Sequence, residues 1–333
     1  MPRAGGGRSV YGLELAGEDD AFAAREAACA ATAVEVVAPG LATARGVDAD
    51  RLRTLAYTHR ASRLLGRCGA SVDAACALLA AASLDRSGTV AVRARDVRST
   101  AGVDTRRVER ELGGVLVDHG FTVDLDDPDH ELRACFAGDT CLLGWLVAES
   151  VRDYGERRPT DRPFFQPGSM APLDARALVN LAGAAPGATL LDPMCGTGGT
   201  LIEAGLVGAR VVGVDAQRKM VRGARENCRG LLGADANAHL LRGDATALPL
   251  ADESVDGVVF DAPYGRQSKI ARHTLCDLVS GALGEAARVA SRAVVVADRS
   301  WIEAARDAGW SVEATFERRV HGSLTRHVHL LNR

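Results

Sequence analysis

Four aspartates in the second half of the chain each follow a short apolar run: Asp192, Asp215, Asp244 and Asp261. The runs are typical of buried strands and alternate with helical patterns, which predicts a parallel sheet covered on both faces. Because ligands bind at the carboxyl ends of such strands, we expect these carboxylates to outline one site. Any one of them alone would equally be a turn residue or a helix cap, so the prediction depends on the set.

The first aspartate begins a glycine-rich turn, DPMCGTGG, at 192–199. Glycines let the backbone approach a ligand closely, although such a turn is also common as a simple tight connection. Leu201 stands where a dinucleotide-binding turn has its third glycine, and Asp192 would repel a pyrophosphate. The turn therefore suits a cationic or amino-bearing ligand. An acid at the end of the next strand, such as Asp215, is typical of ribose binding.

The second half resembles the Rossmann-type S-adenosylmethionine-dependent methyltransferases. The glycine-rich turn is similar to their first cofactor motif, Asp215 to their ribose-binding acid, and GDA at 243–245 to the segment beside the adenine. RPFFQPGSM at 162–170 is similar to the segment that closes over the methionine end of the cofactor. The resemblance implies that S-adenosylmethionine is the cofactor. It implies these cofactor-binding residues: Phe165, Pro167, Gly168, Ser169, Asp192, Pro193, Cys195, Gly196, Gly198, Asp215, Ala216, Asp244, Ala245 and Asp261.

The segment Asp261-Ala262-Pro263-Tyr264 resembles the D/N-P-P-Y/F signature of enzymes that methylate exocyclic amino groups of bases. An exocyclic amino nitrogen is a poor nucleophile because its lone pair is delocalised into the ring. Asp261 and the carbonyl of Ala262 or Pro263 would accept its N–H groups, and Tyr264 would stack on the base. Ala262 stands where the signature has its first proline. Alanine keeps the carbonyl, so the change puts loop rigidity in doubt and leaves the reaction type intact.

These residues require a scaffold, and the patterns predict one in two parts. We expect an α/β fold: a Rossmann-like methyltransferase domain with a mostly parallel sheet and a C-terminal antiparallel hairpin, preceded by an α+β ferredoxin-like and THUMP region. The proline-rich, charged stretch at 151–168 has no helical or strand period and is typical of a linker. The expected parts are a ferredoxin-like region at 1–70, a THUMP domain at 71–150, a linker and cofactor-closing segment at 151–168, and the methyltransferase domain at 169–333.

Segments in the first half of the chain resemble a known family and indicate the substrate. VDLDDPDHELRACFAGDTCLLG at 123–144 is similar to the end of a THUMP domain, an RNA-binding module. YGLELAG near the start and LAYTHRASRLLG at 55–66 resemble the ferredoxin-like region that precedes it. Together with DAPYGRQSKI at 261–270, the order of motifs resembles the archaeal tRNA guanine-10 N2-methyltransferases. That resemblance covers nearly the whole chain and implies conversion of guanosine 10 to its N2-methyl and then N2,N2-dimethyl form.

Arginine-rich stretches at 45–67 and 86–110 support RNA binding, because arginine forks suit phosphates, although a solvated helical face has the same composition. A stacked guanine must leave its stem to react, and we expect Phe164, Phe165 or Tyr264 to line its pocket. The two phenylalanines would equally serve interdomain packing. The candidate RNA-binding residues are Arg60, Arg63, Arg93, Arg95, Arg266 and Lys269.

Composition excludes several classes. The charged fraction of 25% and apolar fraction of 47% are those of a folded globular protein, and no apolar run is long enough for a membrane span. The eight cysteines form no CxxC pair, and His321, His327 and His329 have no partner acid at ligand spacing, so we expect no metal. Cys195 is expected to be a small loop residue, because direct transfer needs no covalent intermediate. We expect a cytoplasmic monomer.

Three alternatives remain at this level. One is an N2-guanine methyltransferase for another tRNA position or for ribosomal RNA. A DNA adenine methyltransferase would share the DAPY segment but leave the first half unexplained. The third is a non-catalytic tRNA-binding module with a vestigial cofactor fold, which the intact acids and Tyr264 disfavour. Whether one or two methyl groups are added, and whether a small activator protein is needed, stays open.

Overall fold

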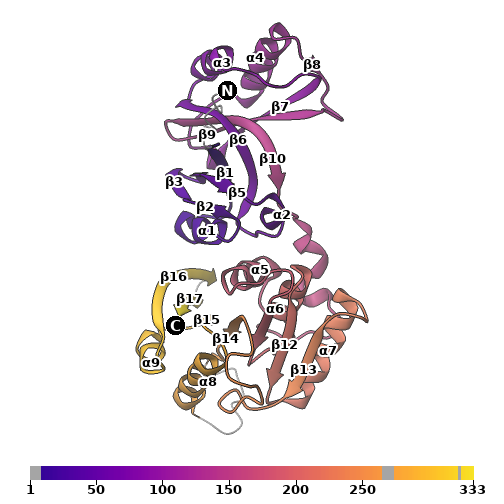
Figure 1. Ribbon diagram of the computed structural model, residues 1–333, viewed down its shortest axis with the longest axis vertical. Helices are drawn as coiled ribbons and strands as arrows, with labels where there is room; N and C mark the ends of the chain where they lie inside the picture. Colours follow the sequence, from indigo (N-terminus) through magenta and orange to yellow (C-terminus); the bar gives the residue numbers. More distant parts are fainter. Residues whose placement is uncertain (1–8, 265–273, 322–323) are drawn as a thin grey trace, which may run out of the picture. The chain divides into compact units, whose positions relative to one another are not determined.

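The computed structural model describes residues 9–264, 274–321 and 324–333, and the candidates Arg266 and Lys269 lie outside them. The chain forms two compact units, one ending at Val151 and the other beginning at Arg152 (Figure 1). Each unit is built around its own sheet.

The N-terminal unit contains an eight-stranded sheet that is antiparallel except where β7 pairs with β9 and β8. In spatial order its strands are β3 (Glu35–Ala38), β4 (Leu41–Ala44), β1 (Tyr11–Leu15), β6 (Thr58–Gly69), β10 (Thr140–Glu149), β9 (His130–Ala137), β7 (Thr89–Asp96) and β8 (Thr122–Val123). A small second sheet pairs β2 (Ala31–Thr32) with β5 (Gly46–Val47). Strand β6 belongs to the predicted ferredoxin-like region at 1–70 and β10 to the predicted THUMP domain at 71–150. Because the two strands pair directly, one sheet spans both predicted regions.

Four helices accompany this sheet: α1 (Asp20–Ala27), α2 (Ala49–Leu52), α3 (Val72–Ala81) and α4 (Thr105–Asp118). Helix α4 shows how the sequence specifies them. The side chain of Asp104 accepts hydrogen bonds from the first turn, and Val108, Leu112 and Leu116 are buried at helical spacing. Strands β2 and β3 are separate short strands because the chain turns between them at Ala33, whose φ is 50°.

The C-terminal unit contains a seven-stranded sheet whose first five strands are parallel. In spatial order they are β13 (Ala238–Arg242), β12 (Arg210–Asp215), β11 (Thr189–Asp192), β14 (Gly257–Asp261), β15 (Arg292–Ala297), β17 (Leu324–Asn332) and β16 (Ser311–His321). Strands β17 and β16 form an antiparallel hairpin at the edge. The predicted fold class, a mostly parallel sheet with a C-terminal antiparallel hairpin, is confirmed.

Helices cover both faces of this sheet: α5 (Pro172–Leu181), α6 (Gly199–Leu206), α7 (Arg218–Leu232), α8 (Leu275–Val289) and α9 (Ile302–Asp307). Alternate strand residues such as Val258 and Phe260 pack with α8 and α9. The intervening Val259 is equally buried, as a sheet with two covered faces requires. The stretch expected to be an irregular linker contains two short 3-10 helices at Asp153–Arg157 and Pro159–Asp161.

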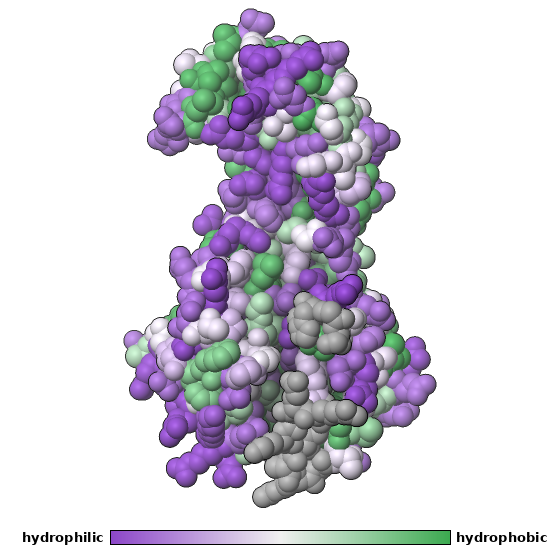
Figure 2. Space-filling model, turned by 180° about the vertical axis from the view of Figure 1, so that it is seen from behind, coloured by the Kyte–Doolittle hydropathy of each residue, from purple (hydrophilic) through white to green (hydrophobic). Residues whose placement is uncertain are grey.

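The surface is mixed in character. Figure 2 shows hydrophobic residues on one face as separate patches among hydrophilic ones. Among the described residues, no helix is both long and apolar enough to span a bilayer.

Candidate functional site

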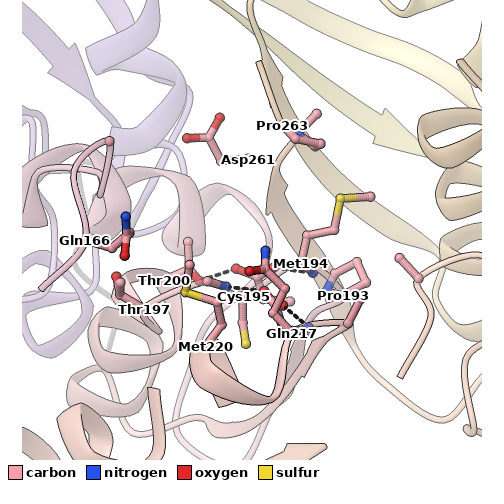
Figure 3. A pocket seen from close by; sticks show the side chains of 18 of the residues that line it. Gln166, Pro193, Met194, Cys195, Thr197, Thr200, Gln217, Met220, Asp261 and Pro263 are labelled. Atoms are coloured by element: carbon pink, nitrogen blue, oxygen red, sulfur yellow. Dashed lines mark hydrogen bonds between the residues drawn. The ribbon is translucent and has the colours of Figure 1, made fainter. Parts of the chain in front are cut away.

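A cavity of about 980 Å³ lies at the carboxyl ends of the parallel strands. Strand β11 sits between β12 and β14, so the direction in which strands are added reverses there. Such a reversal opens a crevice in which α/β sheets bind ligands. Figure 3 shows Gln166, Asp261 and Pro263 around the cavity, with Cys195 and Thr197 from the glycine-rich turn below them. Further lining residues are Pro167, Gly168, Ser169, Asp192, Pro193, Gly196, Asp215, Ala216, Asp244, Ala245, Ala262 and Tyr264.

Asp192 shapes the glycine-rich turn from inside. Its Oδ1 accepts a hydrogen bond from the Met194 N–H at 2.9 Å, and its Oδ2 accepts one from the hydroxyl of Thr200 at the start of α6. Burial raises the pKa of Asp192 to about 7. Both carboxyl oxygens therefore hold the turn against α6, so the side chain acts on a ligand mainly through the backbone that it positions.

Asp215 is held with its carboxylate at the cavity. Its Oδ2 accepts from the Gly196 N–H at 3.1 Å and its Oδ1 from the Gln217 N–H at 2.8 Å. Burial raises the pKa of Asp215, and the two backbone donors oppose that rise. Each carboxylate oxygen has a further lone pair that a ribose hydroxyl can meet. Asp244 is fixed by Thr246, whose backbone N–H and hydroxyl donate to its Oδ1 at 3.0 and 2.8 Å.

Asp261, at the end of β14, belongs to a network across the sheet. The Tyr264 hydroxyl donates to its Oδ1 at 2.6 Å, and Arg326 of β17 lies 3.7 Å from its Oδ2. The Arg326 Nε also donates to the Tyr264 hydroxyl at 3.0 Å. Burial raises the pKa of Asp261 to about 6, with the Arg326 charge acting in the opposite direction. Asp261 therefore titrates just below neutral pH and is mostly ionised at pH 7.

The second layer of this network was not found by sequence reasoning. Arg326 lies 3.8 Å from Asp174 in the first turn of α5, and Arg318 of β16 lies 3.3 Å from the same carboxylate. An arginine in a terminal hairpin, 62 residues from Tyr264, carries no local pattern that would reveal this role. The one available signal was that Arg326 alternates with Val328 and Leu330 and so shares their buried strand face.

Asn227 of α7 holds the segment at 162–170 against that helix through hydrogen bonds. The Asn227 Oδ1 accepts from the Phe164 N–H, and its Nδ2 donates to the Phe164 carbonyl, both at 2.8 Å. The Phe164 ring packs closely against Gly223, where an added Cβ would come within 2.0 Å of it. Ser169 continues the attachment through a 3.0 Å hydrogen bond between its hydroxyl and that of Thr197.

Three predicted residues of this region are not among those that line the cavity. Phe164 packs on α7, and Phe165 has 44% of its surface exposed. Gly198 adopts a left-handed conformation with φ of 81° and lies close to Ala224. Of the three aromatic candidates, Tyr264 alone faces the cavity.

Cys195 is buried beneath the turn, next to Gly213 of β12. Burial raises the pKa of its thiol well above the usual value, so it remains a neutral thiol. Within the described part of the chain, no three histidine, cysteine or acidic side chains come together as a metal site.

The N-terminal arginine candidates are largely occupied by internal partners. Arg60 pairs with Glu149, and Arg63 lies 3.1 Å from Asp85. The other two do likewise: Arg93 donates to the Leu125 carbonyl at 2.7 Å, and Arg95 lies 3.5 Å from Glu14. Their side chains are partly exposed. The acids facing Arg60, Arg63 and Arg95 neutralise much of their charge within the unit, whereas the carbonyl that Arg93 meets leaves its charge in place.

Comparison with known proteins matches this architecture. Residues 159–328 match the family described as the RMKL-like methyltransferase domain, and residues 72–145 match the THUMP domain. The tRNA (guanine(10)-N2)-dimethyltransferase of Methanothermobacter thermautotrophicus is 37% identical over 84% of each chain. The enzyme of the same name from Pyrococcus abyssi is 32% identical over 73% of this chain and 74% of its own.

Solved structures agree in fold. The crystal structure of TrmN from Thermus thermophilus superposes with a TM-score of 0.51 at 23% identity, covering 97% of this chain and 99% of that one. SMU.472, described as a putative methyltransferase complexed with SAH, gives a TM-score of 0.52 at 14% identity, covering 97% of this chain and 98% of that one.

Proposed function

The chain belongs to the RMKL-like methyltransferase family, and on that premise we propose that it methylates the N2 amino group of guanosine 10 in tRNA. The product would be N2-methylguanosine and then N2,N2-dimethylguanosine. The observation that carries the proposal is the placement of Asp261 and its DAPY loop in the same cavity as the ribose-type acid Asp215. The names of the archaeal relatives support guanosine 10 over other positions.

The cavity fits S-adenosylmethionine, the methyl donor of this family. Asp215 offers oxygens that backbone donors hold in place, as the hydroxyls of a ribose require. The turn around Gly196 brings backbone close to the cavity, and the segment ending in Ser169 forms part of its wall. When bound, the donor supplies a methyl group already activated by a sulfonium, so the protein's main task is alignment.

Asp261 is the residue we assign to the guanine amino group. Its Oδ1 is engaged by Tyr264, and its Oδ2 remains able to accept an N–H. The carbonyl of Ala262 or Pro263 would take the second N–H, so that the nitrogen lone pair turns out of conjugation. With a pKa of about 6, the carboxylate can also take up the proton that the nitrogen loses. We assign Tyr264, held by its hydroxyl, to stacking on the base.

A second methyl transfer fits the same arrangement. After the first transfer the nitrogen retains one N–H, and the methyl group occupies the place of the other. Once Asp261 has released the first proton to solvent and a fresh donor has replaced the spent one, its carboxylate holds the remaining N–H and receives the second proton, while the backbone carbonyl has no partner. The variant that lacks the carboxylate should therefore lose both steps.

The remaining assignments complete the proposal. We assign residues 1–70 and 71–150 to holding tRNA, 151–168 to closing the donor site, and 169–333 to catalysis. We further propose that the protein acts in the cytoplasm as a monomer.

The test is transfer of labelled methyl groups to an unmodified tRNA transcript, followed by mapping of the modified nucleotide. The matched substrate is the same transcript with inosine at position 10, which lacks only the N2 amino group. We expect label at guanosine 10 and none in the inosine transcript. Label at another nucleotide would replace the assigned position, and absence of label despite donor binding would remove the catalytic proposal.

The companion variant is Asp261→Ala, with Asp235→Ala as its matched control on an exposed loop. Asp261→Ala should abolish transfer while donor affinity, measured by calorimetry, stays within about threefold, because Asp215 is untouched. The control should behave as the parent does. Full activity of Asp261→Ala would exclude the assigned role.

A further inference from the structure

Helix α7 carries a continuous stripe of arginines on its exposed side. Arg218, Arg222, Arg225 and Arg229 recur at spacings of four, three and four residues, which places them on one face. All four are exposed, whereas the opposite side buries Val221, Ala224 and Cys228 among others. At 1.5 Å per residue, the stripe spans roughly 16 Å. We call these four residues the α7 stripe.

The stripe is not neutralised within the protein. None of its arginines pairs with a carboxylate of the described residues, and Glu226 is the one acid of the helix against five basic residues, the fifth being Lys219. Arg225 donates to the Leu240 carbonyl at 2.9 Å. This bond uses one N–H of the guanidinium but does not neutralise its positive charge. This differs from Arg60, Arg63 and Arg95 of the N-terminal unit, which face Glu149, Asp85 and Glu14.

Helix stability does not account for this arrangement. Like charges four residues apart destabilise a helix by about 0.2–0.5 kcal/mol per pair. The first turn of α7 contains Arg218 and Lys219 and no acid, although the positive end of the helix dipole favours acids there. Helices α1, α3 and α8 of the same chain each have an aspartate in their first turn. A polyanionic partner would offset the repulsion along α7.

The stripe also starts at the catalytic cavity. Gln217 and Met220, which flank its first residue, line the cavity, and so does Arg242 of the neighbouring strand β13. Arg242 donates to the Ala216 carbonyl at 3.2 Å and is likewise unpaired with any described carboxylate. A strand lying along the stripe would reach the rim of the site. A chain with net charge −3 therefore concentrates positive charge beside the site.

From this we infer that the α7 stripe binds the sugar-phosphate backbone of the tRNA substrate, as an RNA contact of the methyltransferase unit itself. Arginine is suited to phosphates because its planar fork can donate two hydrogen bonds at once. Backbone contacts of this kind set affinity and position without reading sequence. The inference rests on the proposed function, and it adds an RNA-binding surface outside the THUMP region.

The test compares two triple variants of the full chain that lose the same charge. The stripe variant is Arg218→Gln, Arg222→Gln and Arg229→Gln; Arg225 stays because of its bond to Leu240. The control is Arg210→Gln, Arg292→Gln and Arg306→Gln, three exposed arginines of the same unit. Affinity for unmodified tRNA is measured across a salt series, and calorimetry with S-adenosylhomocysteine reports whether each variant keeps its fold.

We expect the stripe variant to bind tRNA about tenfold or more weakly near physiological salt, and its log–log salt slope to fall by about 2–3. Its affinity for S-adenosylhomocysteine and its rate at saturating tRNA should match the control. Equal affinities and slopes for the two variants would overturn the inference while leaving methylation of guanosine 10 by the parent untouched. Conversely, a parent that does not methylate guanosine 10 would still give a measurable slope, so the two failures are distinguishable.

A second measurement tests the inference even if the stripe variant does not fold. A photoreactive amino acid placed at Arg222 of the full chain should cross-link to tRNA on illumination, and one placed at Arg306 should not. Cross-linking at both positions alike, or at neither, would overturn the inference.

Discussion

The charge of Arg326 should determine the pH at which the enzyme becomes active. In the substitution Arg326→Gln, the Asp261 carboxylate loses the one cation described within 4 Å of it, at 3.7 Å. That attraction amounts to about 4–5 kcal/mol at an effective dielectric constant near 20 and about 1 kcal/mol in water. Because 23% of the Asp261 side chain is exposed, we expect a value between these limits.

At about 1.36 kcal/mol per pKa unit, the loss should raise the pKa of Asp261 by about one to two units. The ionised carboxylate is the active form, so activity should rise with pH through the pKa, near 6 in the parent and correspondingly higher in the variant. The variant should therefore be about 3- to 25-fold slower than the parent at about pH 6.5 and should approach the parent at about pH 9.

The assay is the single-turnover rate of methyl transfer to unmodified tRNA between about pH 5 and pH 9, with donor and enzyme saturating. Arg326→Lys keeps the charge and should keep the parent profile. Arg318→Gln is the matched control, because Arg318 pairs with Asp174 and not with Asp261. A profile for Arg326→Gln that runs parallel to the parent at every pH would refute the electrostatic role. So would an equal shift in Arg318→Gln.

Three further predictions concern donor binding and stability. Asp215→Ala should weaken donor binding by about tenfold or more, because hydrogen bonds to a charged acceptor are lost, and an unchanged calorimetric Kd would contradict this. Gly223→Ala places a Cβ within 2.0 Å of the Phe164 ring, so it should destabilise the protein by about 1–3 kcal/mol in denaturant titration and raise the donor Kd. An equally stable variant would exclude the packing argument. Glu14→Gln removes the charge that buried Arg133 meets at 2.8 Å, and it should cost about 3 kcal/mol. The test is the urea midpoint; a midpoint equal to the parent's would mean that the pair does not stabilise the unit.

Several features were predictable because they depend on local chemistry. The apolar runs ending at Asp192, Asp215 and Asp261 indicated parallel strands, and their common edge follows from the parallel arrangement. The glycine-rich turn at 192–199 indicated that the backbone approaches a ligand closely, because glycine has no side chain to keep the ligand away. The terminal hairpin was equally readable, because two alternating runs with a short connection favour antiparallel pairing.

The long strands of the N-terminal unit were less readable. Strand β6 mixes arginines with apolar residues and has no strict alternation, since both of its faces are only partly buried. Strand β10 is nearly continuous in apolar residues, so its period does not separate strand from buried helix. Their pairing to each other is a long-range contact that no local pattern specifies.

The sequence by itself determined which residue types stand at the strand ends, and therefore the class of reaction. Only the tertiary structure decided which charges are free and which are paired. It joined Arg326 to Asp261 across the sheet, paired three of the four N-terminal arginine candidates with acids, and left the α7 stripe facing outward. The physical reason is that backbone periodicity acts over a few residues. An ion pair, by contrast, depends on where distant segments meet and on how much water their packing removes.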